Sequence, residues 1–97
     1  MLFAIICTDK PDRLETRLAA RDSHLSYLER YIEKVVHAGP LLDMDGRLCG
    51  SLLVIDVADR AAAEGFAASD PYAKVELFES TVIRGFRTVF RDGAVAE

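Results

Sequence analysis

Cysteine is scarce in this sequence, and the cysteines present are not paired. The chain of 97 residues has two, Cys7 and Cys49, and no C-x-x-C motif. A disulfide framework is therefore excluded, and isolated thiols are typical of a reducing compartment, so we expect a cytoplasmic protein. The histidines, His24 and His37, lack the short spacing to each other or to a cysteine that a zinc site needs. Glycine-rich phosphate-binding motifs are also absent, and we expect neither a metal nor a cofactor.

Excess positive charge and long hydrophobic runs are missing as well. The formal net charge is −4, whereas nucleic-acid modules normally need a basic face for phosphates. The apolar start at residues 2–7 is too short to span a bilayer, has no basic segment before it and is soon followed by Asp9. We therefore expect no nucleic-acid partner, no membrane partner and no signal peptide.

The residues that are present have the composition of a small globular domain. Hydrophobic residues make up 51% of the chain and charged residues 29%, a balance typical of folded proteins. Neither repeats nor low-complexity linkers interrupt the sequence. We therefore expect one domain over residues 1–97, with residues 91–97 frayed at the end.

The hydrophobic periodicity predicts four strands and two helices. Apolar runs predict strands over residues 2–8, 41–44, 48–57 and 75–90. Helical spacing predicts helices over residues 12–36 and 60–68. The order β-α-β-β-α-β is that of a ferredoxin-like α+β fold, a four-stranded antiparallel sheet with two helices on one face.

Local signals add detail to these elements. The first helix would bury an apolar stripe that begins at Leu14 and Leu18, and it would stop near Gly39-Pro40. Asp45-Gly46 lies between two apolar runs and predicts a hairpin. Asp59 is placed to cap the second helix.

Two helices can cover only one face of a four-stranded sheet. The strands predicted over residues 2–8 and 48–57 nevertheless carry apolar residues on both faces. The uncovered face must be buried against another surface, and for one small domain the simplest partner is a second copy. We therefore expect a homodimer in which two sheets pack face to face.

His24 and Asp70 are the first candidates for chemistry. His24 lies near the edge of the first helix's apolar stripe, with Arg17 on the same edge. An imidazole at such a boundary can face a pocket and suits acid/base chemistry near neutral pH. Asp70, which precedes Pro71, could supply the carboxylate that orients it. From the residues alone, the plainer interpretations stay open and are the more frequent: a boundary histidine without a role, and an aspartate that begins a turn.

Further positions carry weaker signals for a binding site. Gly39 and Gly50 permit close backbone approach, and Ser51 offers a hydroxyl group within a strand. A helix stop and a β-bulge would explain the same residues. Tyr72 directly follows the Asp-Pro pair and is expected at the rim of a pocket. Arg84, in the last predicted strand, could bind an anion or only keep an edge solvated.

Short segments along most of the chain resemble the YciI-like (YCII-related) family. They are RDSHLSYL at 21–28, AGPLL at 38–42, GSLLVI at 50–55, SDPY at 69–72 and LFESTVIR at 77–84. Each segment is short, but together they follow the family's order across nearly the whole sequence. One departure is Gly85, where many relatives have proline.

The resemblance implies a fold and a site. The family has a ferredoxin-like fold, similar to that of muconolactone isomerase, and forms dimeric α+β barrels. The histidine of its R-x-x-H-L segment and the aspartate of its D-P segment form an acid/base dyad, and these match His24 and Asp70 here. The chemistry known in the family is sparse and includes a dehydrochlorinase-type reaction on a chlorinated aromatic compound.

We therefore expect a small dimeric enzyme without a cofactor, acting on a small cyclic or carbonyl compound. His24 would transfer protons and Asp70 would orient it. The residues expected to shape the pocket and bind substrate are Ser51, Tyr72, Gly39, Gly50, Arg17 and Arg84. Two alternatives stay open: a non-catalytic ligand-binding or regulatory barrel, and a heme-binding or oxygenase member of the same barrel class.

Overall fold

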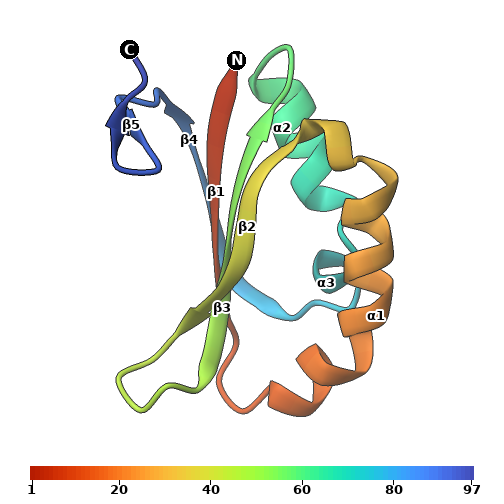
Figure 1. Ribbon diagram of the computed structural model, residues 1–97. Helices are drawn as coiled ribbons and strands as arrows, with labels where there is room; N and C mark the ends of the chain where they lie inside the picture. The colour runs from red at the N-terminus through yellow and green to blue at the C-terminus, as the bar shows by residue number, and fades with distance from the viewer.

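Four strands form one antiparallel sheet, and the helices lie on one side of it. The computed structural model describes all residues, 1–97. The strands are β1 (Leu2–Asp9), β2 (Val35–Leu42), β3 (Leu48–Asp56) and β4 (Phe78–Phe86), in the spatial order β2-β3-β1-β4. The helices are α1 (Leu14–Arg30), α2 (Arg60–Ala68) and the short α3 (Pro71–Lys74), all on the same side (Figure 1). The predicted ferredoxin-like α+β fold is confirmed.

The central strand β1 supplies the middle of the core. Its residues Phe3, Ile5 and Cys7 are 3%, 0% and 2% exposed and face the helices. Leu53 and Ile55 of β3 pair with Ile5 and Phe3 and join the same cluster. Because side chains alternate along a strand, the residues between these face the opposite side of the sheet.

The first helix is shorter than predicted. α1 ends at Arg30, a 3-10 turn η1 (Ile32–Lys34) follows, and β2 begins at Val35. The prediction of a helix that continues to residue 36 and stops at Gly39-Pro40 is wrong. Val35 and Val36 are β-branched and favour extended backbone. Pro40 fits within β2 because this is an edge strand, where a missing N–H can face solvent.

The same helix buries Leu28 as predicted, but the rest of its buried stripe differs from the predicted one. Its buried residues are Arg17, Ala20, His24 and Leu28, at spacings of three and four positions. Leu14 and Leu18, expected inside, are 48% and 53% exposed. The inward face of α1 is the one whose polar side chains find partners in the interior, so the leucines do not decide how the helix is turned.

Two local predictions are confirmed. The hairpin between β2 and β3 turns at Asp43–Arg47, where Asp43 Oδ1 accepts hydrogen bonds of 2.9 Å from the backbone N–H groups of Asp45 and Arg47. Gly46 adopts a φ of +79° there, a conformation that glycine enters without strain. Asp59 caps α2, its side chain accepting a 2.8 Å hydrogen bond from the N–H of Ala62.

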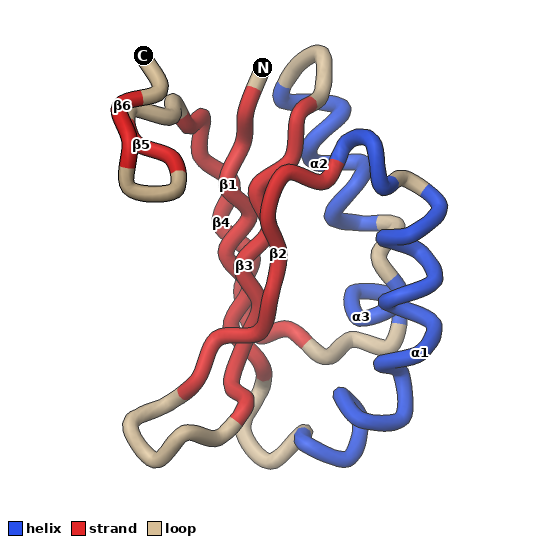
Figure 2. The backbone as a smooth tube through the Cα atoms, viewed as in Figure 1, coloured by secondary structure: helices blue, strands red, loops and turns tan.

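The chain after β4 does not simply fray, as residues 91–97 were expected to do. Strands β5 (Phe90–Arg91) and β6 (Ala94–Val95) pair in a small hairpin with Gly93 at φ +76° in its turn. The hairpin stands away from the four-stranded sheet (Figure 2). Its apolar side chains are open to solvent, with Phe90 68% and Val95 67% exposed.

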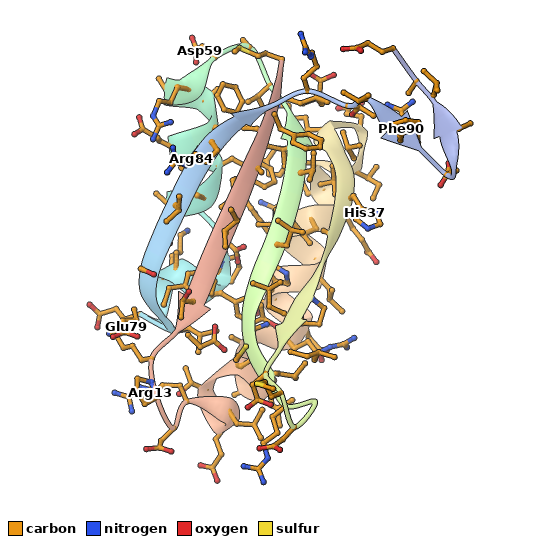
Figure 3. The ribbon with its side chains drawn as sticks, turned by 90° about the vertical axis from the view of Figure 1, so that its left-hand side faces the viewer. Arg13, His37, Asp59, Glu79, Arg84 and Phe90 are labelled. Atoms are coloured by element: carbon orange, nitrogen blue, oxygen red, sulfur yellow. The ribbon has the colours of Figure 1, made fainter.

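The face of the sheet turned away from the helices is apolar and uncovered (Figure 3). We call it the open face, and its apolar residues are Leu2, Ala4, Ile6, Leu52, Val54, Val82 and Phe86. Val82 and Phe86 are 43% and 48% exposed.

Among the helices on the other side, none is both long enough and apolar enough to cross a membrane.

Candidate functional site

His24 and Asp70 meet in the interior between α1 and the start of α3. The Nδ1 atom of His24 lies 2.8 Å and 3.0 Å from the two carboxylate oxygens of Asp70. The residues are 7% and 1% exposed. Their positions in the sequence are 46 apart, and the fold alone brings them together.

Local structure explains why Asp70 is held so firmly. It is the N-cap of α3, and its Oδ1 accepts a 2.9 Å hydrogen bond from the N–H of Tyr72. Pro71 occupies the first helical position, where its missing N–H costs nothing and its fixed φ favours the helix. The Asp-Pro pair thus begins the short helix α3, and the carboxylate of Asp70 also forms a hydrogen bond with His24.

This pairing sets the protonation pattern of the ring. An ionised carboxylate can only accept hydrogen bonds, so the neutral His24 ring carries its proton on Nδ1 and donates it to Asp70. The Nε2 atom then keeps its lone pair and points away from Asp70. Such an atom can remove a proton from a bound molecule, while the carboxylate stabilises the imidazolium that forms.

Tyr72 lies flat against the histidine. Its ring and that of His24 are stacked with centroids 4.0 Å apart and an interplanar angle of 16°. The Arg17 guanidinium carbon lies 4.6 Å from the centroid of the Tyr72 ring. Burial raises the pKa of Tyr72, with the nearby Arg17 charge acting against that rise. The phenol is therefore held in its neutral, hydrogen-bonding form.

Arg17 is fixed by Asp9 and Ser51. Its Nε and Nη2 donate to the two carboxylate oxygens of Asp9 at 2.7 Å and 2.8 Å, and Nη2 also donates to Ser51 Oγ at 2.9 Å. The side chains of Arg17 and Asp9 are 4% and 8% exposed. Burial acts to lower the pKa of Arg17, but its hydrogen bonds to Asp9 and the charge of that carboxylate outweigh burial and raise it.

A cavity of about 340 Å³ opens beside the histidine, between α1 and strands β2 and β3. Its walls include Arg17, Arg21 and His24 of α1, residues 38–40 of β2, Ser51 and Leu53 of β3, and Tyr72 of α3. Three hollows elsewhere are larger, at about 620 Å³, 710 Å³ and 510 Å³. They are more open to solvent and are lined by neither His24 nor Asp70, so the smaller cavity is the candidate site.

The structure gathers most of the predicted site residues, but not all of them. Tyr72 and Ser51 line the cavity, and Gly39 lines it from β2. Gly50 does not line it; a Cβ there would overlap the carbonyl oxygen of Cys7, so this glycine serves the packing of β3 against β1. Arg84 pairs with Ala4 on the open face of the sheet (Figure 3), away from His24.

Two residues near the cavity were missed by the sequence analysis. Asp9 was treated only as the end of a strand, although an acid at the end of β1 and an arginine in the second turn of the following helix are a plausible ion pair in any β-α unit. Arg21 stands within the RDSHLSYL segment but carried no separate signal. No group of three His, Cys, Asp or Glu side chains is close enough together to hold a metal ion.

Comparison with known proteins places this geometry in a family. The YCII-related domain matches residues 1–87. Protein YciI of Escherichia coli O6:H1 (strain CFT073) is 31% identical over 98 residues, covering 93% of this chain and all of the relative. The chain belongs to the YCII-related family. A further relative, an uncharacterised protein of Haemophilus influenzae, is 30% identical with the same coverage. The predicted family is confirmed.

Solved structures agree with this membership. One is 5-chloro-2-hydroxyhydroquinone dehydrochlorinase from Burkholderia phenoliruptrix AC1100, in complex with 2,5-dihydroxybenzoquinone. It shows a TM-score of 0.85 and 30% identity over 90% of this YCII-related chain and 94% of its own. A protein of the antibiotic biosynthesis monooxygenase type from Bacteriodes thetaiotaomicron VPI-5482 gives a TM-score of 0.59 at 16% identity, over 95% and 91% of the two chains. That second likeness shows the fold alone.

Proposed function

We propose that this protein is an enzyme that transfers protons on a small cyclic compound, with His24 as general base and acid and Asp70 as the residue that orients it. The observation that carries the proposal is the buried pair itself. Asp70 occupies Nδ1 of His24, and His24 lines a cavity that Asp70 itself does not reach. A ring held on one side by a carboxylate and on its face by Tyr72 is positioned for proton transfer before substrate arrives.

The reaction class that fits is an elimination or isomerisation without a cofactor. Nε2 of His24 takes a proton from the substrate, and the electrons of that bond form a new double bond as a leaving group departs with its own electron pair. The imidazolium then gives the proton to the leaving anion or to solvent. The similar dehydrochlorinase, which holds 2,5-dihydroxybenzoquinone, supports a hydroxylated six-membered ring as substrate and chloride as leaving group.

The test is release of chloride from 5-chloro-2-hydroxyhydroquinone by the purified protein. We expect His24→Gln to lower kcat by about 10²- to 10⁴-fold, the usual contribution of a general base. His37→Gln is the matched control, because His37 is exposed on β2 and does not line the cavity (Figure 3). Binding without turnover in the unmodified protein would instead favour a ligand-binding module.

Asp70→Asn distinguishes the role of Asp70 in orienting His24 from its role in stabilising the fold. The amide oxygen at the Oδ1 position can still cap α3. The amide has no negative charge to stabilise the imidazolium, and its NH₂ group takes the place of the oxygen that lies 3.0 Å from Nδ1, where a donor opposes the Nδ1 proton. We expect a fall in kcat comparable to that of His24→Gln in a protein that still folds. Unchanged turnover in both variants would refute the dyad.

We also propose that the open face joins a second copy. Val82 and Phe86 lie on the apolar open face, which nothing covers, and each is about half exposed. Light scattering should give about twice 10.7 kDa. Val82→Asp should produce a monomer, because a carboxylate buried in an apolar interface costs several kcal/mol. Leu18→Asp, at an equally exposed position on α1, should leave the mass unchanged.

Cytoplasmic location belongs to the same proposal. Both cysteines are free, and Cys7 is buried at the centre of the sheet with no partner for a disulfide. Free thiols persist most readily where the surroundings are reducing. Fractionation of the native host's cells, followed by detection with an antibody, would check it; recovery outside the cytoplasm would contradict it.

A further inference from the structure

The cavity beside His24 has a basic wall that the proposed proton transfer does not use. Arg17 and Arg21 both line it, and no carboxylate does. Asp70 is behind the histidine ring and Asp9 is behind Arg17, so neither acid is presented to a molecule in the cavity. A bound molecule therefore meets positive charge without a nearby negative group.

The two arginines differ in how much of that charge is free. Arg17 is neutralised by the two-pronged ion pair with Asp9, and its Nη2 is further engaged by Ser51. Arg21 forms no ion pair and no side-chain hydrogen bond within the protein, and it is exposed. Because a guanidinium carries several donors in a planar fork, Arg21 can bind a planar anion through two hydrogen bonds.

Arg21 lies about one helical turn before His24 on α1. Arg21 precedes His24 by three positions, so the two side chains share one face of α1 about one turn apart. Leu28 follows His24 by one further turn and belongs to the apolar core. Along the helix the cavity therefore changes from cationic at Arg21 to apolar at Leu28, with His24 between them.

The facing strand repeats the same gradient. Ser51 of β3, which binds Arg17, pairs with Pro40 of β2, and two residues further along β3 Leu53 pairs with Ala38. Leu53 is 2% exposed and packs in the same core cluster as Leu28. From Ser51 to Leu53 the wall on β3 thus changes from polar to apolar in the same direction as the wall on α1, and Leu48 of β3 adds an apolar side chain before Ser51.

We propose that Arg21 is the residue that selects an anionic substrate, and that the substrate class is a single ring bearing an acidic hydroxyl or carboxylate group. The anionic oxygen binds Arg21, the unsubstituted edge of the ring lies against Leu28 and Leu53, and the carbon or hydroxyl that loses its proton lies beside Nε2 of His24. The volume of about 340 Å³ is near the lower end of small-molecule pockets, about 300–1,000 Å³, and fits one ring rather than a fused system. This assignment rests on the proposed function, since it names the substrate of that same site.

The test compares two probes of nearly equal shape and different charge. 2,5-Dihydroxybenzoquinone is a vinylogous acid and is anionic at neutral pH, while 2,5-diaminobenzoquinone is a vinylogous amide and is neutral. Calorimetric titration gives the Kd of each probe for the unmodified protein and for Arg21→Gln, Arg21→Lys and Arg84→Gln. Arg84→Gln is the matched control because Arg84 is an exposed arginine on the open face.

We expect Arg21→Gln to raise the Kd of the anion about 10- to 100-fold, the range for hydrogen bonds to a charged group, and to leave the Kd of the neutral probe unchanged. Arg21→Lys should restore part of the loss, because it keeps the charge without the fork. Arg84→Gln should change neither value. The preference of the unmodified protein for the anion should also weaken as salt is added.

Three results would show that Arg21 does not select the substrate, and each can be distinguished from a result that excludes the proposed enzyme activity. Equal Kd values of the two probes for the unmodified protein, an unchanged anion Kd in Arg21→Gln, or equal losses for both probes would each remove Arg21 as the selecting residue. In those cases chloride release that depends on His24 would leave the proposed enzyme standing. If the unmodified protein binds neither probe and releases no chloride, both proposals fall together.

Discussion

The two faces of the four-stranded sheet are built from alternate residues of the same strands and are both largely apolar, yet they differ in burial and in the charged groups beside them. Toward the helices, β1 presents Phe3, Ile5 and Cys7, all almost completely buried. Toward the open face, it presents Ala4 and Ile6 beside partly buried neighbours on β3 and half-exposed neighbours on β4. The covered side holds the buried His24–Asp70 and Arg17–Asp9 pairs. On the open side, the N-terminal ammonium of Met1 and Asp56 of β3 form an ion pair that is exposed to solvent.

The comparison shows how a small protein can keep charged groups inside. A buried ion pair is costly to desolvate, and it is tolerated when the remaining donors and acceptors also find partners. Here every buried side-chain nitrogen and oxygen has a hydrogen-bond partner. The charges are concentrated where β1 ends at Asp9 and α1 begins, while the apolar core fills the other end. The polar end of the covered face can therefore hold a site without weakening the core.

The largest effect is expected from replacing an arginine on each side of the sheet. Arg17→Gln leaves the carboxylate of Asp9, with a side chain only 8% exposed, without its partner, and we expect the free energy of unfolding to fall by about 3–5 kcal/mol. Arg84→Gln on the open face, measured in the Val82→Asp background so that no second copy covers it, should change it by no more than about 0.5 kcal/mol. Urea unfolding followed by circular dichroism measures both. Equal losses would show that the covered face has no special dependence on its charges.

The strands and helices that form the two faces could be predicted from the sequence. The polar side chains that are buried on the covered face could not. The succession of strands and helices along the chain, the Asp45-Gly46 hairpin and the Asp59 cap depend on local patterns, and the structure has all of them. Burial of Arg17 depends on Asp9 and Ser51, the latter 34 positions away. No local pattern reports such a contact, so periodicity assigned the inward face of α1 to its leucines.

The same limit explains the rest of the site. The proximity of His24 and Asp70 followed from the family resemblance and not from their spacing, because the sheet must form before the start of α3 meets α1. The early end of α1 had a local signal in Val35 and Val36, but the apolar spacing of these residues also continued a helical pattern. Two interpretations with equal local support are separated only by tertiary packing.

A pair of glycines sharpens the comparison between the centre and the edge of the sheet. At Gly50 in β3 an added Cβ would overlap the carbonyl oxygen of Cys7 in the central strand, whereas at Gly39 in the edge strand it would meet nothing within 4 Å. We expect Gly50→Ala to lower the free energy of unfolding by about 1–3 kcal/mol, since backbone must move to make room. Gly39→Ala should be close to neutral. Thermal unfolding of the two variants beside the unmodified protein distinguishes them, and equal midpoints would contradict the packing described for β3.

The two cysteines provide a comparison that depends on pH. Burial raises the pKa of Cys7 from its ordinary value of 9.0 to about 11. Between these values the unfolded chain has released a proton that the folded chain still holds, so the free energy of unfolding falls as pH rises. The loss from this thiol is at most about 3 kcal/mol. Cys7→Ala should flatten the fall between pH 9 and 11, while Cys49→Ala should keep it. A slope that is the same in both variants would exclude the buried thiol as its source.

The smallest effect is expected from removing the C-terminal hairpin. Residues 89–97 lie beyond the part of the chain that the YCII-related domain matches, and the side chains of Phe90 and Val95 are about two-thirds exposed. Since the hairpin buries little against the covered face, deleting these residues should change the free energy of unfolding by about 0.5 kcal/mol or less. The Kd for 2,5-dihydroxybenzoquinone should stay the same, because no residue of the hairpin lines the cavity beside His24. A large loss of stability that appears only at high protein concentration would instead place the hairpin in contact with a second copy and join it to the open face.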